Sequence, residues 1–229
     1  MRKGAIILFK NGYCYQSYGW NILRPLGEIQ NVLDHLEKYE VDEISIIRPL
    51  KGFDSDKSFY SDLEKLSKIK SSTPISFGGG LYDLNRIKSV RSLSFERLIF
   101  SSHLFSNDLK ILKKTSNLVG KQAIVGCLPL KFFKNKLMVY NSMKNKFSSF
   151  KELNNDQLEM CDEFIVYDCL NEGGGNSFDI KILNDDFFYD KKIIIAGGTN
   201  KDMSLLTDKN IASILIENRI LHNEYSLKR

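Results

Sequence analysis

The sequence predicts a closed (β/α)8 TIM barrel, an α/β fold, formed as a single domain by residues 1–229. Short apolar runs alternate with segments of helical periodicity, and this alternation is typical of a parallel sheet covered by helices. Glycines follow two of the runs, at residues 78–80 and 197–198, as they do where parallel strands end near a bound anion. The 229 residues suit one such barrel, and no linker or shift in composition divides them.

The bulk composition excludes some classes of function without naming one. Apolar residues make up 42%, which is enough for a large core, and the formal net charge is only +5. Lysines and acidic residues are interspersed, so we expect no nucleic-acid partner. The apolar run from Ala5 ends before Lys10 and is too short for a signal peptide or a membrane span. We therefore expect a cytoplasmic protein with no membrane partner.

The cysteines show no pattern of a metal centre or of a redox pair. They form no C-x-x-C motif, and no histidine stands at metal-ligand spacing from them. We expect no metal and no cofactor, and we expect buried free thiols at Cys14, Cys127, Cys161 and Cys169.

The first half of the chain carries four predicted strands. Residues 5–9 form the first, and Lys10-Asn11-Gly12 predicts a tight turn into a second extended piece at 13–16. A helix over about 27–39 has an apolar face made of Ile29, Val32, Leu33 and Leu36. Strands at 44–47, 75–77 and 97–100 follow, each with a helix after it, at about 59–69, after residue 80 and around 109–112.

The second half continues the alternation. Strands are predicted at 123–128, 164–167, 193–196 and 211–216, with a hairpin insertion at 131–140 and helices near 155–161, 179–183 and 202–207. The resulting eight strands recur at roughly 25–30 residues per unit, which fits a closed barrel better than an open sheet. Because loops after the strands form the active face of such barrels, the glycines at 78–80, 173–175 and 197–198 would share one rim.

Six short motifs also follow an order and spacing that a known enzyme family has. They are Lys10-Asn11-Gly12, Val41-Asp42-Glu43-Ile44, Phe77-Gly78-Gly79-Gly80-Leu81, Gln122-Ala123-Ile124-Val125, Leu137-Met138-Val139-Tyr140 and Ile194-Ile195-Ala196-Gly197-Gly198. Together they resemble the cyclase subunit of imidazole glycerol phosphate synthase over nearly the whole chain. The resemblance implies a barrel of the ribulose-phosphate-binding type. It also implies a glutaminase partner at the strand-start face, and ammonia that crosses the barrel to a phosphosugar-derived substrate on the other face.

The catalytic positions of that family are changed here. The resemblance places an acid and a base, both aspartates in the family, late in the first and fifth strands, where this chain has Leu8 and Pro129. Neither side chain transfers a proton, and general acid–base help is typically worth about 10²–10⁴-fold in rate. Neighbouring groups that are candidates to replace them are Asp168, Glu172 and His103.

The resemblance also implies two phosphate sites on the active face. At the first, Gly79, Gly80, Ser101 and Ser102 match or mimic the glycines and polar donors of the family. This half of the face is therefore predicted to retain a phosphate site.

The second phosphate site is altered. Gly173, Gly197 and Gly198 persist, but Ala196 replaces a serine and the eighth strand runs into Glu217. Because a carboxylate repels a nearby phosphate, a substrate with two phosphates is not expected.

The opposite face retains the charges that the resemblance implies for an ammonia gate. The family has a ring of four charged residues near the strand starts, and the matching positions are Arg2, Glu43, Arg97 and Glu163. Burying four ionic groups in an apolar barrel is costly unless they are paired. Solvated charges at the strand starts are the alternative interpretation. By the same resemblance, Glu96 and Gln122 are candidates for the glutaminase interface.

The leading hypothesis is a cyclase-like barrel that partners a glutaminase and conducts ammonia without cyclase chemistry of its own. The resemblance extends to divergent relatives in surface-polysaccharide gene clusters, which implies sugar amidation with a separate sugar amidotransferase as a further partner. One alternative is a genuine cyclase (a lyase) of histidine biosynthesis with relocated acids. Another is a pseudoenzyme that binds a sugar phosphate.

Overall fold

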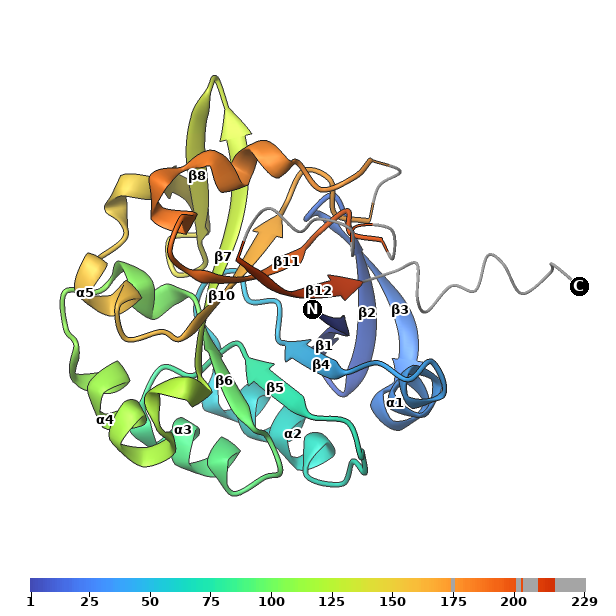
Figure 1. Cartoon of the computed structure of the whole chain (residues 1–229). Helices are drawn as coiled ribbons and strands as arrows, with labels where there is room; N and C mark the ends of the chain where they lie inside the picture. Colours follow the sequence, from blue (N-terminus) through green and yellow to red (C-terminus); the bar gives the residue numbers. More distant parts are fainter. Residues whose placement is uncertain (174–175, 201–202, 204–209, 217–229) are drawn as a thin grey trace, which may run out of the picture.

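Parallel strands close into a barrel in the computed structural model, which describes residues 1–173, 176–200, 203 and 210–216 (Figure 1). The barrel strands are β1 Arg2–Lys10, β4 Glu43–Ile47, β5 Ile75–Gly78, β6 Arg97–Phe100, β7 Ile124–Phe133, β10 Glu163–Asp168, β11 Lys192–Ala196 and β12 Ile211–Ile216. They pair in that order, and β12 returns to β1 with Arg2 opposite Ser213. The predicted (β/α)8 barrel is confirmed.

Two insertions extend the barrel at the strand ends. After β1, the strands β2 Tyr13–Tyr18 and β3 Ile22–Glu28 form an antiparallel ribbon, and after β7 the strands β8 Lys136–Asn141 and β9 Lys146–Ser149 do the same. The sequence predicted β2 and the β7–β8 hairpin but missed β3. The reason is that β3 holds Pro25 and Gly27, is mostly exposed, and pairs only with β2. Proline is tolerated in such an edge strand, yet it removes the pattern by which a strand is recognised.

Helices cover the outside of the barrel. They are α1 Ile29–Lys38, α2 Asp56–Leu66, α3 Leu84–Arg91, α4 Lys110–Val119 and α5 Asn155–Leu158. After β10, the 3-10 turns η4 Ile180–Asn184 and η5 Asp186–Phe188 stand where the sequence predicted a helix at 179–183. Most of the helix expected at 202–207 lies outside the described residues. Across the part of the chain that is described, no helix has both the length and the apolar character needed to cross a membrane.

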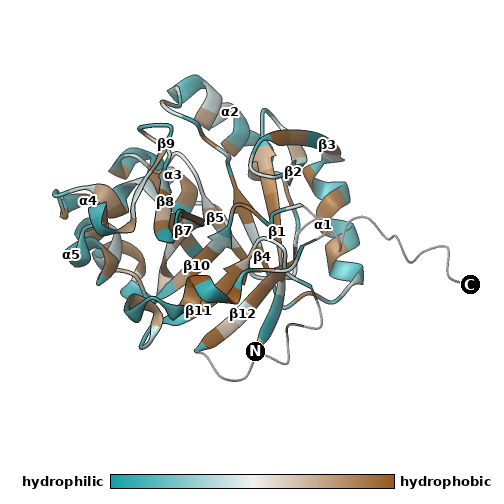
Figure 2. Cartoon of the chain, turned by 90° about the horizontal axis from the view of Figure 1, so that it is seen from above, coloured by the Kyte–Doolittle hydropathy of each residue, from teal (hydrophilic) through white to brown (hydrophobic). Residues whose placement is uncertain are grey.

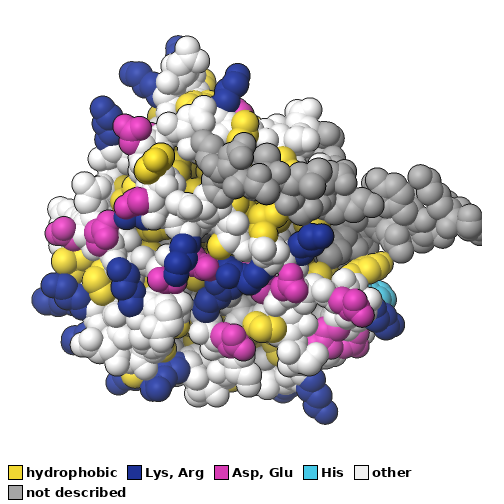
Figure 3. Space-filling model, viewed as in Figure 1, with side chains coloured by type: hydrophobic (Ala, Val, Ile, Leu, Met, Phe, Trp, Pro, Cys, Tyr) yellow, Lys and Arg dark blue, Asp and Glu magenta, His cyan; other side chains and the backbone are white. Residues whose placement is uncertain are grey.

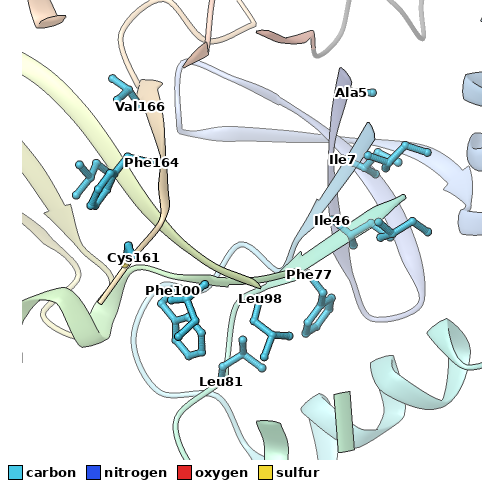
Figure 4. Packing of buried hydrophobic residues seen from close by; sticks show 14 of the residues in the cluster. Ala5, Ile7, Ile46, Phe77, Leu81, Leu98, Phe100, Cys161, Phe164 and Val166 are labelled. Carbon is cyan, nitrogen blue, oxygen red and sulfur yellow. The ribbon is translucent and has the colours of Figure 1, made fainter. Parts of the chain in front are cut away.

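The alternation of side chains along each strand divides the core into two parts. Residues such as Ile7, Ile46 and Phe77 belong to a large cluster between the strands and the helices, part of which Figure 4 displays. The intervening residues fill the barrel itself with a second cluster: Ile6, Ile99, Val125, Cys127, Ile165, Tyr167, Cys169, Ile194, Ala196 and Leu215. Figure 2 shows the corresponding concentration of hydrophobic residues on the strands and of hydrophilic residues on the helices.

Candidate functional site

A cavity of about 290 Å³ opens at the strand-end face of the barrel, and we call it the mouth pocket. Leu8 and Ile47 line it from the ends of β1 and β4, and Pro129 lines it from the middle of β7. Trp20, from the turn between β2 and β3, lies edge-on to the rings of Tyr140 and Tyr167, with ring centroids 5.6 Å and 5.1 Å away. The first insertion thus covers part of the pocket.

Both positions at which the resemblance implies a catalytic aspartate face this pocket. Leu8 and Pro129 belong to its lining. The charged side chains that line it are Lys10, Arg48 and Lys51, and no carboxylate is among its described lining residues. The mouth pocket therefore has a basic and apolar wall where an acid and a base would have to stand.

Asp168 lies at the end of β10, and its carboxylate is already occupied. One oxygen accepts the backbone N–H groups of Leu170 and Asn171, and the other accepts the Asn171 amide at 2.6 Å and the Asp179 N–H at 2.9 Å. Asp168 is buried and does not line the mouth pocket. Through these contacts Asp168 holds the loop after β10 in place. Its catalytic role stays a prediction without geometric support.

Glu172 is buried directly behind the aromatic cover of the pocket. Its carboxylate accepts hydrogen bonds from the backbone N–H of Trp20 at 2.5 Å and from the Tyr167 hydroxyl at 3.1 Å. Burial raises the pKa of Glu172 against the opposing effect of these hydrogen bonds and of one from Ser17. A proton is therefore retained more readily here than on an exposed glutamate. Glu172 does not itself line the pocket. Its hydrogen bond to the backbone of Trp20 holds the turn at Trp20 in place.

His103 is the one candidate proton carrier that lines the mouth pocket. It lies in η1 Ser102–Phe105, and its Nε2 is 2.8 Å from the Leu81 carbonyl oxygen, so Nε2 carries the proton and donates. Burial lowers the pKa of His103, which favours the neutral ring. His35 is exposed on α1, and His222 lies outside the described residues.

The residues of the predicted first phosphate site lie together in the lining of the pocket, and their binding of a phosphate stays a prediction. Gly79, Gly80, Ser101 and Ser102 all line it. A Cβ on Gly79 would lie 2.4 Å from the Arg48 carbonyl oxygen, and its φ of 97° is in the left-handed region. Close packing against the end of β4 thus requires this glycine, whether or not an anion binds.

A buried ionic cluster supports the glycine loop, and sequence reasoning missed it. Arg48 contacts Asp54 at 2.6 Å and Asp62 at 2.9 Å, while Arg86 contacts Asp54 at 3.1 Å and donates to the Gly80 carbonyl oxygen at 2.9 Å. Their side chains are almost completely buried. The charge of Arg48 is therefore compensated by carboxylates rather than offered to a ligand. The only sequence signal was an unusual density of acids near one arginine, at 54, 56 and 62.

The residues of the predicted second phosphate site lie apart from the pocket. Gly173, Gly197 and Gly198 are not among its lining residues. A Cβ on Gly197 would lie 2.3 Å from the Asp168 carbonyl oxygen, so tight packing again accounts for the glycine. Glu217, the predicted source of repulsion, lies outside the described residues.

At the strand starts, the charged residues close into a ring, which we call the ionic ring: Arg2, Glu43, Arg97 and Glu163. Arg2 contacts Glu43 at 3.0 Å and Glu163 at 2.7 Å, and Arg97 contacts Glu163 at 2.5 Å and also pairs with Glu43. Ser213 donates a further hydrogen bond to Glu43. Figure 3 shows basic and acidic side chains gathered near the middle of this face, where the N-terminus lies. The four charged side chains therefore lie together and compensate one another. Their role as a gate stays a prediction.

Glu96 and Gln122 are both exposed, and each lies at the start of a barrel strand. Glu96 precedes Arg97 in the chain, and Gln122 lies in η2 Lys121–Ala123 before β7. They are therefore accessible to a partner on the face that carries the ionic ring.

The four cysteines are buried as free thiols. Burial raises the pKa of Cys127, on the pocket wall, to about 12.

A family model described as "Histidine biosynthesis protein" matches residues 21–226. Among curated proteins, the chain is 22% identical over 165 residues to a protein of Leptospira borgpetersenii provisionally named imidazole glycerol phosphate synthase subunit HisF; the match covers 70% of this chain and 64% of that relative. A protein of Leptospira interrogans with the same provisional name is 20% identical over 77% of this chain and 71% of its own length. One of Vibrio vulnificus (strain YJ016), provisionally named subunit hisF3, is 26% identical over 46% and 40%.

Proposed function

Because this chain belongs to the histidine biosynthesis protein family, we propose that it partners a glutaminase and conducts ammonia through its barrel, without cyclase chemistry of its own. Its matched relatives carry the provisional name of a subunit of imidazole glycerol phosphate synthase. We further propose that the ammonia serves the amidation of a sugar in surface-polysaccharide biosynthesis, with a sugar amidotransferase as the acceptor enzyme.

The observation that carries the proposal is the ionic ring at one end of the barrel, opposite a pocket whose described lining residues include no carboxylate. Glu43 and Glu163 are buried at the start of the barrel, and each is paired with both Arg2 and Arg97. Replacing such buried pairs by apolar side chains is often neutral or stabilising. Stability therefore does not account for the ring. We propose instead that the ring serves as a closable entrance for a small polar molecule.

The interior between the ring and the mouth pocket is apolar and closed. Val125, Ile165 and Ile194 are each only 1% exposed in the middle of the barrel. A column of aliphatic side chains favours neutral ammonia over the ammonium ion, since burying an unpaired charge is far more costly. Conduction then requires these side chains to change rotamer as ammonia passes.

The mouth pocket supports the loss of cyclase activity. Leu8 and Pro129 line it, Asp168 is saturated by four hydrogen bonds, and Glu172 lies behind the wall. Among the candidates only His103 reaches the cavity. One histidine does not supply both the acid and the base that the family's reaction uses.

One observation favours a second function, the binding of a sugar phosphate. Gly80, Ser101 and Ser102 line the same pocket as Lys10 and Lys51, so the pocket offers polar and cationic groups to a phosphate. Calorimetry with sugar phosphates separates the two proposals, because a conduit without a bound substrate needs no affinity for them.

The test of the proposed function measures glutamate formation by a glutaminase encoded beside this chain. The chain is expected to raise the rate on the order of tenfold, and Arg97→Ala or Glu163→Ala to abolish the increase. Lys68→Ala is the matched control, since it breaks an exposed ion pair with Glu64 on α2. Circular dichroism verifies that each variant is folded. A chain that leaves the glutaminase rate unchanged contradicts the proposal, and growth of a histidine auxotroph lacking the cyclase would establish a genuine cyclase instead.

A further inference from the structure

Large apolar side chains are exposed around the mouth pocket. They come from the start of β3 and from three loops: Ile22 is 65% exposed, Leu23 42%, Phe53 82%, Met143 49% and Leu170 59%. We call this set the strand-end rim. A single exposed apolar residue needs no explanation, but several large ones gathered around one opening mark an interaction site.

Hydrogen bonds join these loops into one continuous surface. The Gly52 N–H donates to the Ser142 carbonyl oxygen at 2.8 Å, which ties the loop of Phe53 to the turn of Met143. Lys51 Nζ donates to the Trp20 carbonyl oxygen at 3.3 Å, next to Ile22 and Leu23.

A third hydrogen bond extends this connection to the loop after β10. The Gly19 N–H donates to the Glu172 carbonyl oxygen at 2.9 Å, and this bond reaches the loop of Leu170. A surface held together in this way is formed before any partner arrives, and little ordering is left for the moment of binding.

The charges on the same loops select the kind of partner. Arg24, Lys51, Lys144 and Lys146 are exposed, whereas Glu172 is buried. Asp54 is buried as well and is bound by two arginines. Lys134 and Lys136 add positive charge at the tip of the projecting β7–β8 hairpin (Figure 1). A partner surface that complements the strand-end rim would have an apolar centre and an acidic border.

We propose that the strand-end rim docks the enzyme that consumes the ammonia, through an apolar surface bordered by acidic residues. The inference rests on the proposed function, because the mouth pocket is where ammonia would leave the barrel. Ammonia released into water at neutral pH is protonated and diluted. An apolar seal around the opening prevents both, and a protein with its own acceptor site at the centre satisfies this geometry. An anionic membrane would meet the same charges but would leave the ammonia without an acceptor.

The experiment uses the full chain and the ammonia-dependent sugar amidotransferase of the same organism. Analytical ultracentrifugation and surface plasmon resonance are expected to detect a complex, which weakens as salt rises. The double variant Phe53→Glu with Met143→Glu is expected to lower the affinity about 30-fold or more, the size of a central hot spot. The matched control is Tyr60→Glu, which changes a 41% exposed aromatic on α2, away from the rim.

Activation of the glutaminase is measured in parallel for every variant. If the chain activates the glutaminase but the amidotransferase does not bind, or if the double variant binds as the unchanged chain does, the docking proposal is wrong. Failure of glutaminase activation by the unchanged chain overturns the proposed function instead. Vesicles containing phosphatidylglycerol are tested alone, and binding to them that the double variant loses, without an amidotransferase complex, assigns the rim to a membrane.

Discussion

The two ends of the barrel handle charge in opposite ways. At the strand starts, two glutamates and two arginines compensate one another within the ionic ring. At the strand ends, the described lining of the mouth pocket is cationic and apolar, and the described hydrogen-bond partners of Glu172 behind it are Ser17, Trp20 and Tyr167 rather than an arginine. The difference teaches that paired charges form a closed ring at the strand starts, whereas at the strand ends the acids that pair with Arg48 stand behind the pocket and none is among its described lining residues.

Removing one member of the ionic ring should give the largest loss in the free energy of unfolding. Glu43→Ala leaves Arg2 and Arg97, whose side chains are 39% and 19% exposed, each with one carboxylate fewer, and a loss of about 3 kcal/mol in the free energy of unfolding is expected. Urea denaturation measures it. Glu64→Ala, which removes one member of an exposed pair, should cost at most about 1 kcal/mol. Equal small losses for both would mean that the ring is merely solvated.

The glycine turn at the mouth should give the next largest effect. Gly79→Ala places a Cβ 2.4 Å from the Arg48 carbonyl oxygen, whereas Gly27→Ala, also at positive φ, meets nothing within 4 Å. Both variants carry backbone strain, so their difference isolates the steric clash, which is expected to be about 1–3 kcal/mol. Thermal and urea unfolding of the pair test this. Equal stability of the two variants would show that the loop relaxes away from β4.

Glu172 should give a smaller effect that depends on pH. Its pKa is raised in the folded chain, so the folded state binds the proton more tightly than the unfolded state does. The free energy of unfolding therefore decreases as pH rises from about 4.5 through the raised pKa, and Glu172→Gln lacks this part of the decrease. Melting temperatures of both proteins between pH 4.5 and pH 7.5 give the difference. Parallel curves would mean that Glu172 is not held in a desolvated site.

The thiol at the mouth should give the smallest effect. Burial raises the pKa of Cys127 to about 12, so almost no thiolate forms at pH 8 although the residue lines the pocket. A thiol-reactive dye is expected to label the native chain very slowly and all four cysteines after unfolding in urea. Rapid native labelling that Cys127→Ser removes would mean that the mouth is more open than the structure shows.

Much of the barrel follows from local sequence patterns. Apolar runs such as residues 97–100 and 211–216 coincide with β6 and β12, because a strand buried on both faces needs a continuous apolar stretch. The resemblance to a known family also pointed to the residues of the ionic ring and of the predicted first phosphate site. Their contacts were not identified, since 161 positions separate Arg2 from Glu163.

Three features were decided by the tertiary structure alone. The edge strand β3 forms only because β2 offers it hydrogen bonds, and the cluster around Arg48 forms only because β4, α2 and α3 converge on Gly80. The strand-end rim joins residues from 22 to 170. Periodicity reports which side of an element is buried, whereas the grouping of distant polar or exposed side chains depends on how the elements close in space.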